Sequence, residues 1–338
     1  MSGPLRIGIL STARIARAFI AGVAPSDLVK VTAVASRDTV KAERFARELG
    51  ITRHYGSYEA LLADREIDAI YNPLPNSLHA EWSIRATQAG KHVLCEKPLA
   101  ASANEAVAMF ESARQHGVHL VEGYPYRAQP HCAKLRELLG AGAIGEVRLI
   151  QASFGFTMAD AANIRLDPGL AGGALMDAGS YPVSLIGMVA NQRPTRVTAV
   201  ARWADTGVDR TLAATLEFES ELLAQISCSF ATAPYRHALI VGTEGAIQTA
   251  FPNHAPPRGS AVVLLKRGTS WSTDFEPIEV PATDGFRAEA ESFARLLNGD
   301  EDGWSGATPE ESIDIMLTLD ATRLSAQTGR PVYLETVA

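Results

Sequence analysis

The stretch GILSTARIA, Gly8 to Ala16, decides the fold prediction, because it follows a short apolar run at the place where a dinucleotide-binding loop would stand. In a Rossmann fingerprint three glycines make the tight turn, let the backbone approach the pyrophosphate and allow close helix–strand packing. Ser11, Ala13 and Ala16 occupy those positions here. All three side chains are small, and the helix that begins near Arg14 would point its free N–H groups at an anion. By itself the loop also fits an ordinary strand-to-helix turn.

Residues 1–124 alternate apolar strands with helical patterns. The expected strands are Arg6–Leu10, Val29–Ala35, His54–Tyr55, Ala69–Tyr71, His92–Cys95 and His119–Glu122. The expected helices are Ile15–Gly22, Asp38–Gly50, Ser57–Ala63, Ser77–Ala89 and Ala103–Gln115. This alternation predicts an α/β fold with a doubly wound parallel sheet, a Rossmann domain.

The pattern changes after Gly123, and residues 125–338 are expected to form a second, substrate-binding domain of α+β type. Alternating apolar and polar residues predict a largely antiparallel sheet with one covered and one open face. Its expected strands are Val147–Phe154, Arg196–Ala204, Leu212–Phe218, Leu222–Phe230 and His237–Gly242, with helices Pro130–Leu139, Gly285–Asn298 and Ser312–Thr328. Phe251–Ser260, with three prolines, is expected to be a surface loop.

The second expected strand ends in VASRD, Val34 to Asp38, where an acidic residue would hold the 2′-hydroxyl of NAD. Ser36 and Arg37 stand there instead, and Arg37 can pair with a 2′-phosphate in a charge-assisted, bidentate way. Asp38 is expected to cap the following helix. The pattern favours NADP(H), with NAD(H) as the alternative.

Composition excludes several classes of function. The chain has 338 residues, 46% of them hydrophobic, and a net charge of -7 without a basic patch, so no nucleic-acid partner is expected. No secretory leader or membrane span is expected. Three scattered cysteines (Cys95, Cys132 and Cys228) fit reduced thiols in a cytoplasm. His116 and His119 flank a turn, and we predict no metal site.

Three further stretches carry a family resemblance: YNPLPNSLHAEW (Tyr71–Trp82), VLCEKPLA (Val93–Ala100) and GGALMDAGSYPVSLI (Gly172–Ile186). Together they resemble the glucose–fructose oxidoreductase / inositol dehydrogenase family, Gfo/Idh/MocA, in the right order over essentially the whole chain. The resemblance implies that GILSTARIA is a glycine-poor nucleotide loop. It also implies a cis peptide bond before Pro98.

The candidate catalytic residues are Lys97, Asp177 and Tyr181. Lys97 stands at the carboxyl end of a parallel strand, where doubly wound sheets place their ligands. Asp177 and Tyr181 are four residues apart and share one face if the segment is helical, with Pro182 tolerable only in a first turn. The resemblance implies that Tyr181 is the general acid/base on the substrate hydroxyl, that Lys97 lowers its pKa, and that Asp177 orients the substrate and the pair.

Tyrosine at position 181 places the chain near the branch that resembles NADP-dependent D-xylose dehydrogenases and dimeric dihydrodiol dehydrogenases. The expected cofactor-binding residues are Gly8, Ser11, Thr12, Ala13, Arg14, Ile15, Ser36, Arg37, Pro73, Leu74, Asn76, His79, Glu96, Lys97 and Arg165. The expected substrate-binding residues are Lys97, Tyr126, Arg127, Asn163, Asp177 and Tyr181. Loose aromatics such as Tyr124 and Phe156 fit a core better than a binding site.

The expected function is an NADP-dependent oxidoreductase that passes a hydride between nicotinamide C4 and a carbinol carbon, with C1 of an aldose such as D-xylose as the preferred target, giving a lactone. Alternatives in the same class are reduction of a keto-sugar of the 1,5-anhydrofructose type and oxidation of a trans-dihydrodiol. An NAD-retaining glycoside hydrolase is disfavoured by Arg37. A non-catalytic cofactor sensor would need neither Lys97 nor Tyr181. We expect a homodimer or homotetramer through the second sheet, because LAATLEF and LLAQISCSF are taken to place apolar residues outward.

Overall fold

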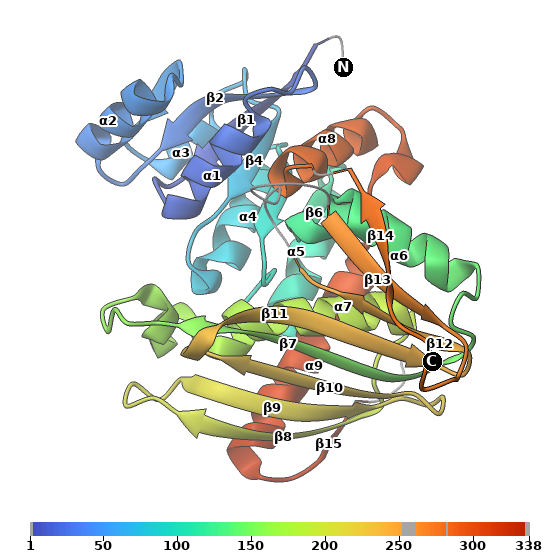
Figure 1. Cartoon of the computed structure of the whole chain (residues 1–338). Helices are drawn as coiled ribbons and strands as arrows, with labels where there is room; N and C mark the ends of the chain where they lie inside the picture. Colours follow the sequence, from blue (N-terminus) through green and yellow to red (C-terminus); the bar gives the residue numbers. More distant parts are fainter. Residues whose placement is uncertain (1–2, 252–260, 282, 335–338) are drawn as a thin grey trace. The chain divides into compact units, whose positions relative to one another are not determined.

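The computed structural model describes residues 3–251, 261–281 and 283–334. The chain forms two compact units (Figure 1). Unit 1 takes residues 3–129 and returns for 283–309, and unit 2 takes the rest of the described chain. The first crossing between the units therefore follows Gln129, a few residues beyond the expected boundary.

Unit 1 is built on a six-stranded sheet. Its strands are β1 (Leu5–Leu10), β2 (Val29–Ala35), β3 (Arg53–Tyr55), β4 (Ala69–Asn72), β5 (His92–Glu96) and β6 (Leu120–Gly123). They lie in the order β3-β2-β1-β4-β5-β6, and all pairs are parallel. The predicted doubly wound fold is confirmed. The order reverses between β1 and β4, which is where such sheets bind ligands at the carboxyl ends of the strands.

The five helices expected in residues 1–124 are present, each with bounds within about two residues of the expected ones. They are α1 (Arg14–Val23), α2 (Thr39–Leu49), α3 (Tyr58–Leu62), α4 (His79–Gln88) and α5 (Ala103–Gln115), with the 3-10 turns η1 (Asn76–Leu78) and η2 (Pro125–Ala128). The Asp38 side chain accepts a hydrogen bond from the Lys41 N–H at 3.1 Å, so its predicted role as a cap is confirmed. Gly50 ends α2 with φ +68°, a conformation that glycine adopts without steric cost.

A helix from late in the chain completes the core of unit 1. This helix, α8 (Gly285–Leu297), is followed by the short turn η6 (Glu301–Gly303). Phe286 and Phe293 are buried in one cluster with β1 and α1, and the Phe286 ring meets Phe19 edge-on at 6.2 Å. The prediction that this helix closes the second domain is therefore wrong. Its apolar face fits either unit, and the sequence pattern does not say which.

Unit 2 is built on a nine-stranded sheet in the order β14-β13-β12-β11-β7-β10-β9-β8-β15. The strands are β7 (Val147–Thr157), β8 (Arg196–Trp203), β9 (Asp209–Glu217), β10 (Leu223–Ser229), β11 (Ala231–Gly242), β12 (Gly245–Thr249), β13 (Ala261–Arg267), β14 (Glu276–Val280) and β15 (Val332–Tyr333). Among the described strands only β7 and β10 pair in parallel, so the predicted largely antiparallel sheet is confirmed. The sequence analysis missed β12 to β15, and Pro252–Ser260 lies outside the described residues.

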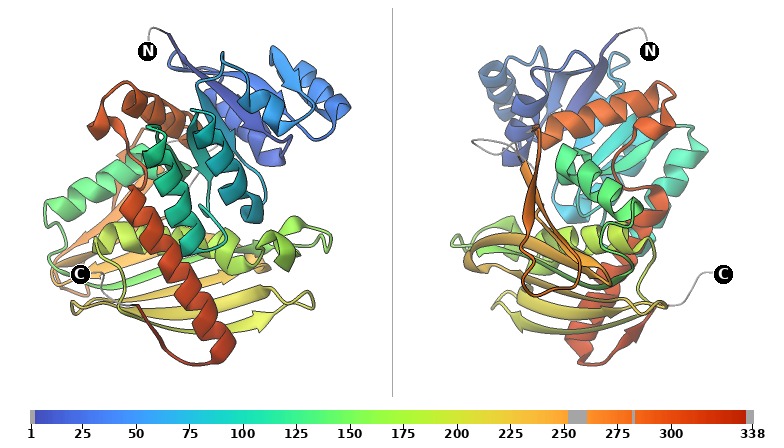
Figure 2. Two further views of the ribbon diagram at one scale, coloured as in Figure 1. Left: turned by 180° about the vertical axis from the view of Figure 1, so that it is seen from behind. Right: turned by 45° about the vertical axis from the view of Figure 1, so that its right-hand side comes forward.

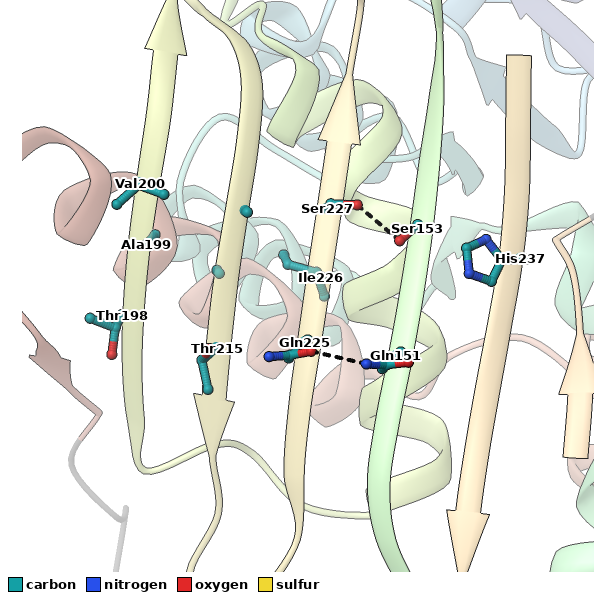
Figure 3. A pocket seen from close by; sticks show the side chains of 12 residues that line it. Gln151, Ser153, Thr198, Ala199, Val200, Thr215, Gln225, Ile226, Ser227 and His237 are labelled. Carbon is teal, nitrogen blue, oxygen red and sulfur yellow. Dashed lines mark hydrogen bonds between the residues drawn. The ribbon is translucent and has the colours of Figure 1, made fainter. Parts of the chain in front are cut away.

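Helices pack on one face of this sheet. They are α6 (Pro130–Gly140), α7 (Ser180–Ala190) and α9 (Pro309–Thr328), and short turns η3 (Ile164–Leu166), η4 (Pro168–Leu170) and η5 (Leu175–Gly179) lead into α7. The long helix α9 crosses the strands of the covered face (Figure 2, left). Figure 3 looks onto the opposite face, with the helices behind the sheet.

The open face carries small and polar side chains together with a few apolar ones, so the expectation that apolar residues point outward holds only in part. In LAATLEF the leucines are buried under the sheet, and Ala213 and Thr215 point outward. Between β7 and β10, Gln151 bonds Gln225 at 3.1 Å and Ser153 lies 2.9 Å from Ser227 (Figure 3). Most large apolar residues of these strands face inward onto the helices, whereas Val200, which lines the hollow of the open face, is 69% exposed and Leu223 is 47% exposed.

Candidate active site

The turn between β1 and α1 has the shape of a nucleotide loop. Ser11 has φ +79°, the left-handed conformation that a glycine would supply at this place. Its hydroxyl accepts a hydrogen bond from the Ala13 N–H at 3.2 Å, and Ala13 itself leaves the amino end of α1 without a side-chain cap. The Ala16 N–H donates to the Ala13 carbonyl at 3.1 Å, so the N–H groups of Arg14 and Ile15 are the ones that can bind an anion, which fits a dinucleotide phosphate.

The other predicted residues of this loop are distributed around that turn. Thr12 and Arg14 lie at the turn with Arg14 exposed, whereas Ile15 packs against the core. Gly8 is inside β1, where a Cβ would stand 2.9 Å from Leu61 Cδ2. Close packing thus explains Gly8, and its assignment to the cofactor stays a prediction.

The end of β2 presents a cation. Ser36 is buried and its hydroxyl accepts from the Asp38 N–H at 3.2 Å, which fixes the turn that carries Arg37. Arg37 is exposed, and no carboxylate of the described chain lies within ion-pair distance of it. Burial raises the pKa of Tyr58, and the nearby Arg37 opposes that shift. A guanidinium after β2 that contacts the Tyr58 phenol and pairs with no carboxylate of the described residues fits the 2′-phosphate of NADP.

Lys97 follows β5 directly and stands on a well-anchored segment. The Tyr71 hydroxyl donates to Glu96 Oε1 at 2.5 Å in the interior. The Lys97–Pro98 peptide bond is cis, as expected. Beyond it, the Leu99 N–H donates to the buried Glu122 carboxylate at 2.9 Å. The residues on both sides of Lys97 are thus fixed by buried hydrogen bonds.

His79 supports the same segment from α4. Its Nδ1 lies 2.9 Å from the Pro98 carbonyl oxygen and its Nε2 lies 2.8 Å from the Leu74 carbonyl oxygen. Burial lowers the pKa of His79, while the two carbonyl oxygens favour its charged form. Both ring nitrogens of His79 are therefore engaged by main-chain carbonyl oxygens, which gives this histidine a structural role. Pro73 and Leu74 are buried beside it, and Asn76 begins η1 at the same edge of the sheet.

Asp177 and Tyr181 lie on one continuous helical segment of unit 2. Asp177 is in η5, a π-helical turn of a kind frequent at functional sites, and α7 follows at Ser180. Pro182 is the third residue of α7, within its first turn, as expected. The Tyr181 side chain is buried, with the residue 4% exposed.

Arg165 meets Asp177 from the loop before this segment. The Arg165 Nε donates to Asp177 Oδ2 at 2.7 Å. The Arg165 N–H is held by Asn163 Oδ1 at 3.1 Å, and the Arg165 carbonyl accepts from the Gly173 N–H at 2.8 Å. Two predicted residues, Asn163 and Arg165, are therefore brought together with Asp177 through backbone and side-chain contacts.

Aromatic rings surround Tyr181. Phe154 on β7 meets the Tyr181 ring edge-on at 5.4 Å, and Phe251 lies 6.3 Å from it. The Phe156 and Phe154 ring centres are 5.8 Å apart, and the Arg236 guanidinium lies 5.0 Å from the Phe154 ring centre. The sequence analysis treated Phe156 as core, and its contact with Phe154 puts it one ring away from Tyr181.

Tyr126 and Arg127 are buried completely, at 0% and 1% exposure, in η2 of unit 1. Their assignment to the substrate stays a prediction.

His119 stacks on His92, with ring centres 5.6 Å apart, and His116 Nδ1 lies 2.8 Å from the Ser112 carbonyl oxygen. Within the described residues, no group of three or more His, Cys, Asp or Glu side chains is arranged to hold a metal ion.

Comparison with known proteins agrees with this geometry. Residues 5–124 match the model of an oxidoreductase family with an NAD-binding Rossmann fold, and residues 132–248 match the GFO/IDH/MocA C-terminal domain. The chain belongs to the Gfo/Idh/MocA family. It is an NAD(P)-dependent oxidoreductase of sugar hydroxyl or keto groups.

Relatives within the Gfo/Idh/MocA family differ in substrate. D-xylose 1-dehydrogenase (NADP(+)) 2 of Haloferax volcanii is 39% identical, covering 98% of this chain and 100% of the relative. A trans-1,2-dihydrobenzene-1,2-diol dehydrogenase of Danio rerio is 35% identical over 87% of this chain and 88% of its own. The crystal structure of KijD10, a 3-ketoreductase of Actinomadura kijaniata in complex with NADP and TDP-benzene, matches with a TM-score of 0.86 at 31% identity. The match covers 95% of this chain and 98% of the KijD10 chain.

The helices of the described chain are all too short or too polar to span a membrane.

Proposed function

We propose that this enzyme oxidises an aldose such as D-xylose at C1 to the lactone, with NADP as the oxidant. The observation that carries the proposal is the helical segment with Asp177 and Tyr181, because it holds a carboxylate and a phenol four residues apart, one paired with Arg165 and the other enclosed by aromatic rings. The similarity to a D-xylose dehydrogenase over nearly the whole chain supports this choice of substrate.

NADP(H) is the cofactor in this proposal. The residues that would hold it are the Ser11–Ala13 turn with the amino end of α1, and Ser36 and Arg37 at the end of β2. When bound, the cofactor accepts or gives the hydride at nicotinamide C4. Ser11, with the backbone conformation of a glycine, keeps the turn tight. Arg37 supplies charge for the 2′-phosphate.

Tyr181 is the general acid/base in this proposal. It takes the proton of the C1 hydroxyl as the hydride leaves that carbon, and it returns a proton in the reverse direction. A phenol with a pKa near 10 is a weak base at neutral pH, so we assign to the Lys97 ammonium the role of lowering that pKa. Asp177 accepts a hydrogen bond from the substrate and orients it.

The test measures absorbance at the nicotinamide band with NADP or NAD and with D-xylose, D-glucose, myo-inositol or a trans-dihydrodiol. We expect faster reduction of NADP with one aldose. In Tyr181→Phe we expect kcat to fall by a factor of about 100 or more, since general acid–base groups contribute that much. Tyr333→Phe is the matched control, because Tyr333 is 72% exposed on β15. Full turnover in Tyr181→Phe would contradict the role of the phenol.

Reduction of a keto-sugar is the second candidate, because a 3-ketoreductase shares the fold at a TM-score of 0.86. NADPH oxidation with 1,5-anhydrofructose, together with no reduction of NADP by any aldose, would replace the first proposal by this one. A nicotinamide spectrum that stays with the purified protein, without net turnover of added NADP, would instead indicate the hydrolytic class. Silence with every substrate and both cofactors would indicate a cofactor sensor.

We also propose that a second copy of the chain covers the open face of the sheet in unit 2. The hollow of about 580 Å³ on this face is lined by Gln, Ser, Thr, Ala, Val, Ile and His side chains and by no ionised carboxylate, Lys or Arg (Figure 3). Contact with its own copy would bury no carboxylate, Lys or Arg of this lining, and burial of charged groups is the costliest kind of desolvation. Sedimentation of the protein and of Ala213→Arg tests this, and an unchanged sedimentation coefficient contradicts it.

We assign the enzyme to the cytoplasm, because Cys95, Cys132 and Cys228 are buried and not in disulfides.

A further inference from the structure

We propose that Asp209 is a positioning residue for Asp177 and Tyr181, because its carboxylate fixes the start of the helical segment that carries them. This inference rests on the proposed function of that pair. Asp209 is the first residue of β9 and is 8% exposed. Its Oδ2 accepts a hydrogen bond from the Leu175 N–H at 2.6 Å, at the first residue of η5.

The segment has no cap of its own. Ala174 precedes η5 and has no side chain able to accept the first N–H groups. Asp209 supplies that acceptor from a different strand, and the N–H of Ala174 also faces its carboxylate. A carboxylate at the amino end of a helical segment satisfies unpaired donors and interacts favourably with the helix dipole.

The neighbouring glycine is matched to this carboxylate. Gly173 has φ +118°, and a Cβ at this position would overlap Asp209 Oδ1. The Gly173 N–H donates to the Arg165 carbonyl at 2.8 Å, and its own carbonyl accepts from the Asp177 N–H at 3.1 Å. Asp209, Gly173, Arg165 and Asp177 thus form one connected set, in which a shift of the cap moves the backbone of Asp177.

The charges around Asp209 come from three elements. Arg323 on α9 is the cation that favours the ionised form of Asp209. The buried Cys228 thiol on β10 is near Asp209 and Asp177, and the negative charge of each carboxylate raises the pKa of this thiol. Burial raises the pKa of Asp209 to about 7, although the N–H groups of Leu175 and Ala174 favour the ionised form and oppose this rise. The ionised carboxylate can accept at both oxygens, whereas the protonated one uses an oxygen as a donor. The cap is therefore strongest above pH 7.

The test compares Asp209→Asn with wild type and with Asp205→Asn, the same change at an exposed residue of the preceding turn. Hydrogen–deuterium exchange of the peptide spanning 173–183 reports the cap without any substrate. We expect faster exchange in Asp209→Asn only. We also expect kcat to fall by a factor of about 10 to 100 with the KM for NADP unchanged, since small misplacements of catalytic groups act on that scale. The acid limb of the kcat–pH profile near pH 7 should disappear.

The outcomes separate the two proposals. Unchanged exchange in Asp209→Asn overturns the capping role, whatever happens to turnover. Faster exchange with wild-type kcat and an unaltered pH profile overturns the positioning role. If wild type turns over no sugar at all, the proposed function fails, and exchange still decides whether Asp209 holds the segment.

Discussion

Arg165 donates from its Nε to Asp177 Oδ2 across 2.7 Å, and this contact joins the loop after β7 to the helical segment that carries Tyr181. The Arg165 side chain is 42% exposed and that of Asp177 is 16% exposed, so the pair is shielded on the carboxylate side. The sequence resemblance implies a cofactor contact for Arg165. In the structure this arginine has a carboxylate partner within its own unit, which makes it a partner of a proposed catalytic residue.

Arg165→Ala is expected to lower kcat by a factor of about 10, because a charge-assisted hydrogen bond that orients Asp177 is lost. Arg165→Lys should recover only part of the rate, since an ammonium lacks the planar Nε donor. Steady-state kinetics decide the role: a rise in the KM for NADP alone would restore the cofactor assignment. Arg330→Ala, at an exposed arginine after α9, serves as the control.

Ser11→Gly is expected to raise the free energy of unfolding by about 1 kcal/mol, because a non-glycine residue at φ +79° is strained. Ser26→Gly is the matched control. Like Ser11, Ser26 accepts a hydrogen bond from the N–H two residues further along the chain, that of Leu28, at 3.1 Å, but Ser26 does not have a positive φ. Denaturant unfolding should show stabilisation by the first change and destabilisation by the second. Equal effects would show that Ser11 is not strained.

Gly173→Ala is expected to destabilise the fold by about 2 kcal/mol or more and to abolish most turnover, because the methyl group would overlap the Asp209 carboxylate at φ +118°. Gly187→Ala lies on α7 with open space around its Cβ and should stabilise by about 0.5–1 kcal/mol. Thermal unfolding and kcat of the two variants provide the comparison. A wild-type Tm for Gly173→Ala would contradict the packing argument.

Arg37→Ala is expected to raise the KM for NADP by a factor of about 10 to 100 and to leave the KM for NAD unchanged, because only NADP has the 2′-phosphate. Arg47→Ala removes another exposed cation of unit 1 and should leave both values as they are. Initial rates with the two cofactors measure the ratio. Parallel losses for NADP and NAD would place Arg37 outside the ribose site.

The pH dependence of stability should carry the signature of Asp209. Its pKa is about 7 in the fold, against a reference value of 3.8, so between these values the native state holds a proton that the unfolded state has released. The free energy of unfolding therefore falls as pH rises from about 4 to 7, by at most about 4 kcal/mol. Asp209→Asn should remove this slope. The measurement is denaturant unfolding between about pH 4 and 7, carried out for wild type and for the variant and compared. An unchanged slope would show that Asp209 does not titrate there.

Local patterns in the sequence account for much of the fold. The parallel sheet of unit 1 follows from apolar strands that alternate with capped helices, and Asp38 and Gly50 mark the ends of α2 because their effects reach only a few residues. For Asp177 and Tyr181 the sequence analysis states helical structure only as a condition, and the structure meets that condition. Strands β12 to β15 lacked so clear an alternation and were not predicted.

The sequence by itself determined the doubly wound sheet, since that depends on periodicity and on contacts close along the chain, and the family resemblance supplied the candidate residues at its carboxyl edge. Tertiary structure alone decided that α8 joins unit 1, that Ser11 takes the conformation of a glycine, and that Asp209 caps the segment of Asp177. Each of these depends on groups brought together from distant parts of the chain. Packing selects such partners by shape and by unsatisfied hydrogen bonds, and neither leaves a periodic signal in the sequence.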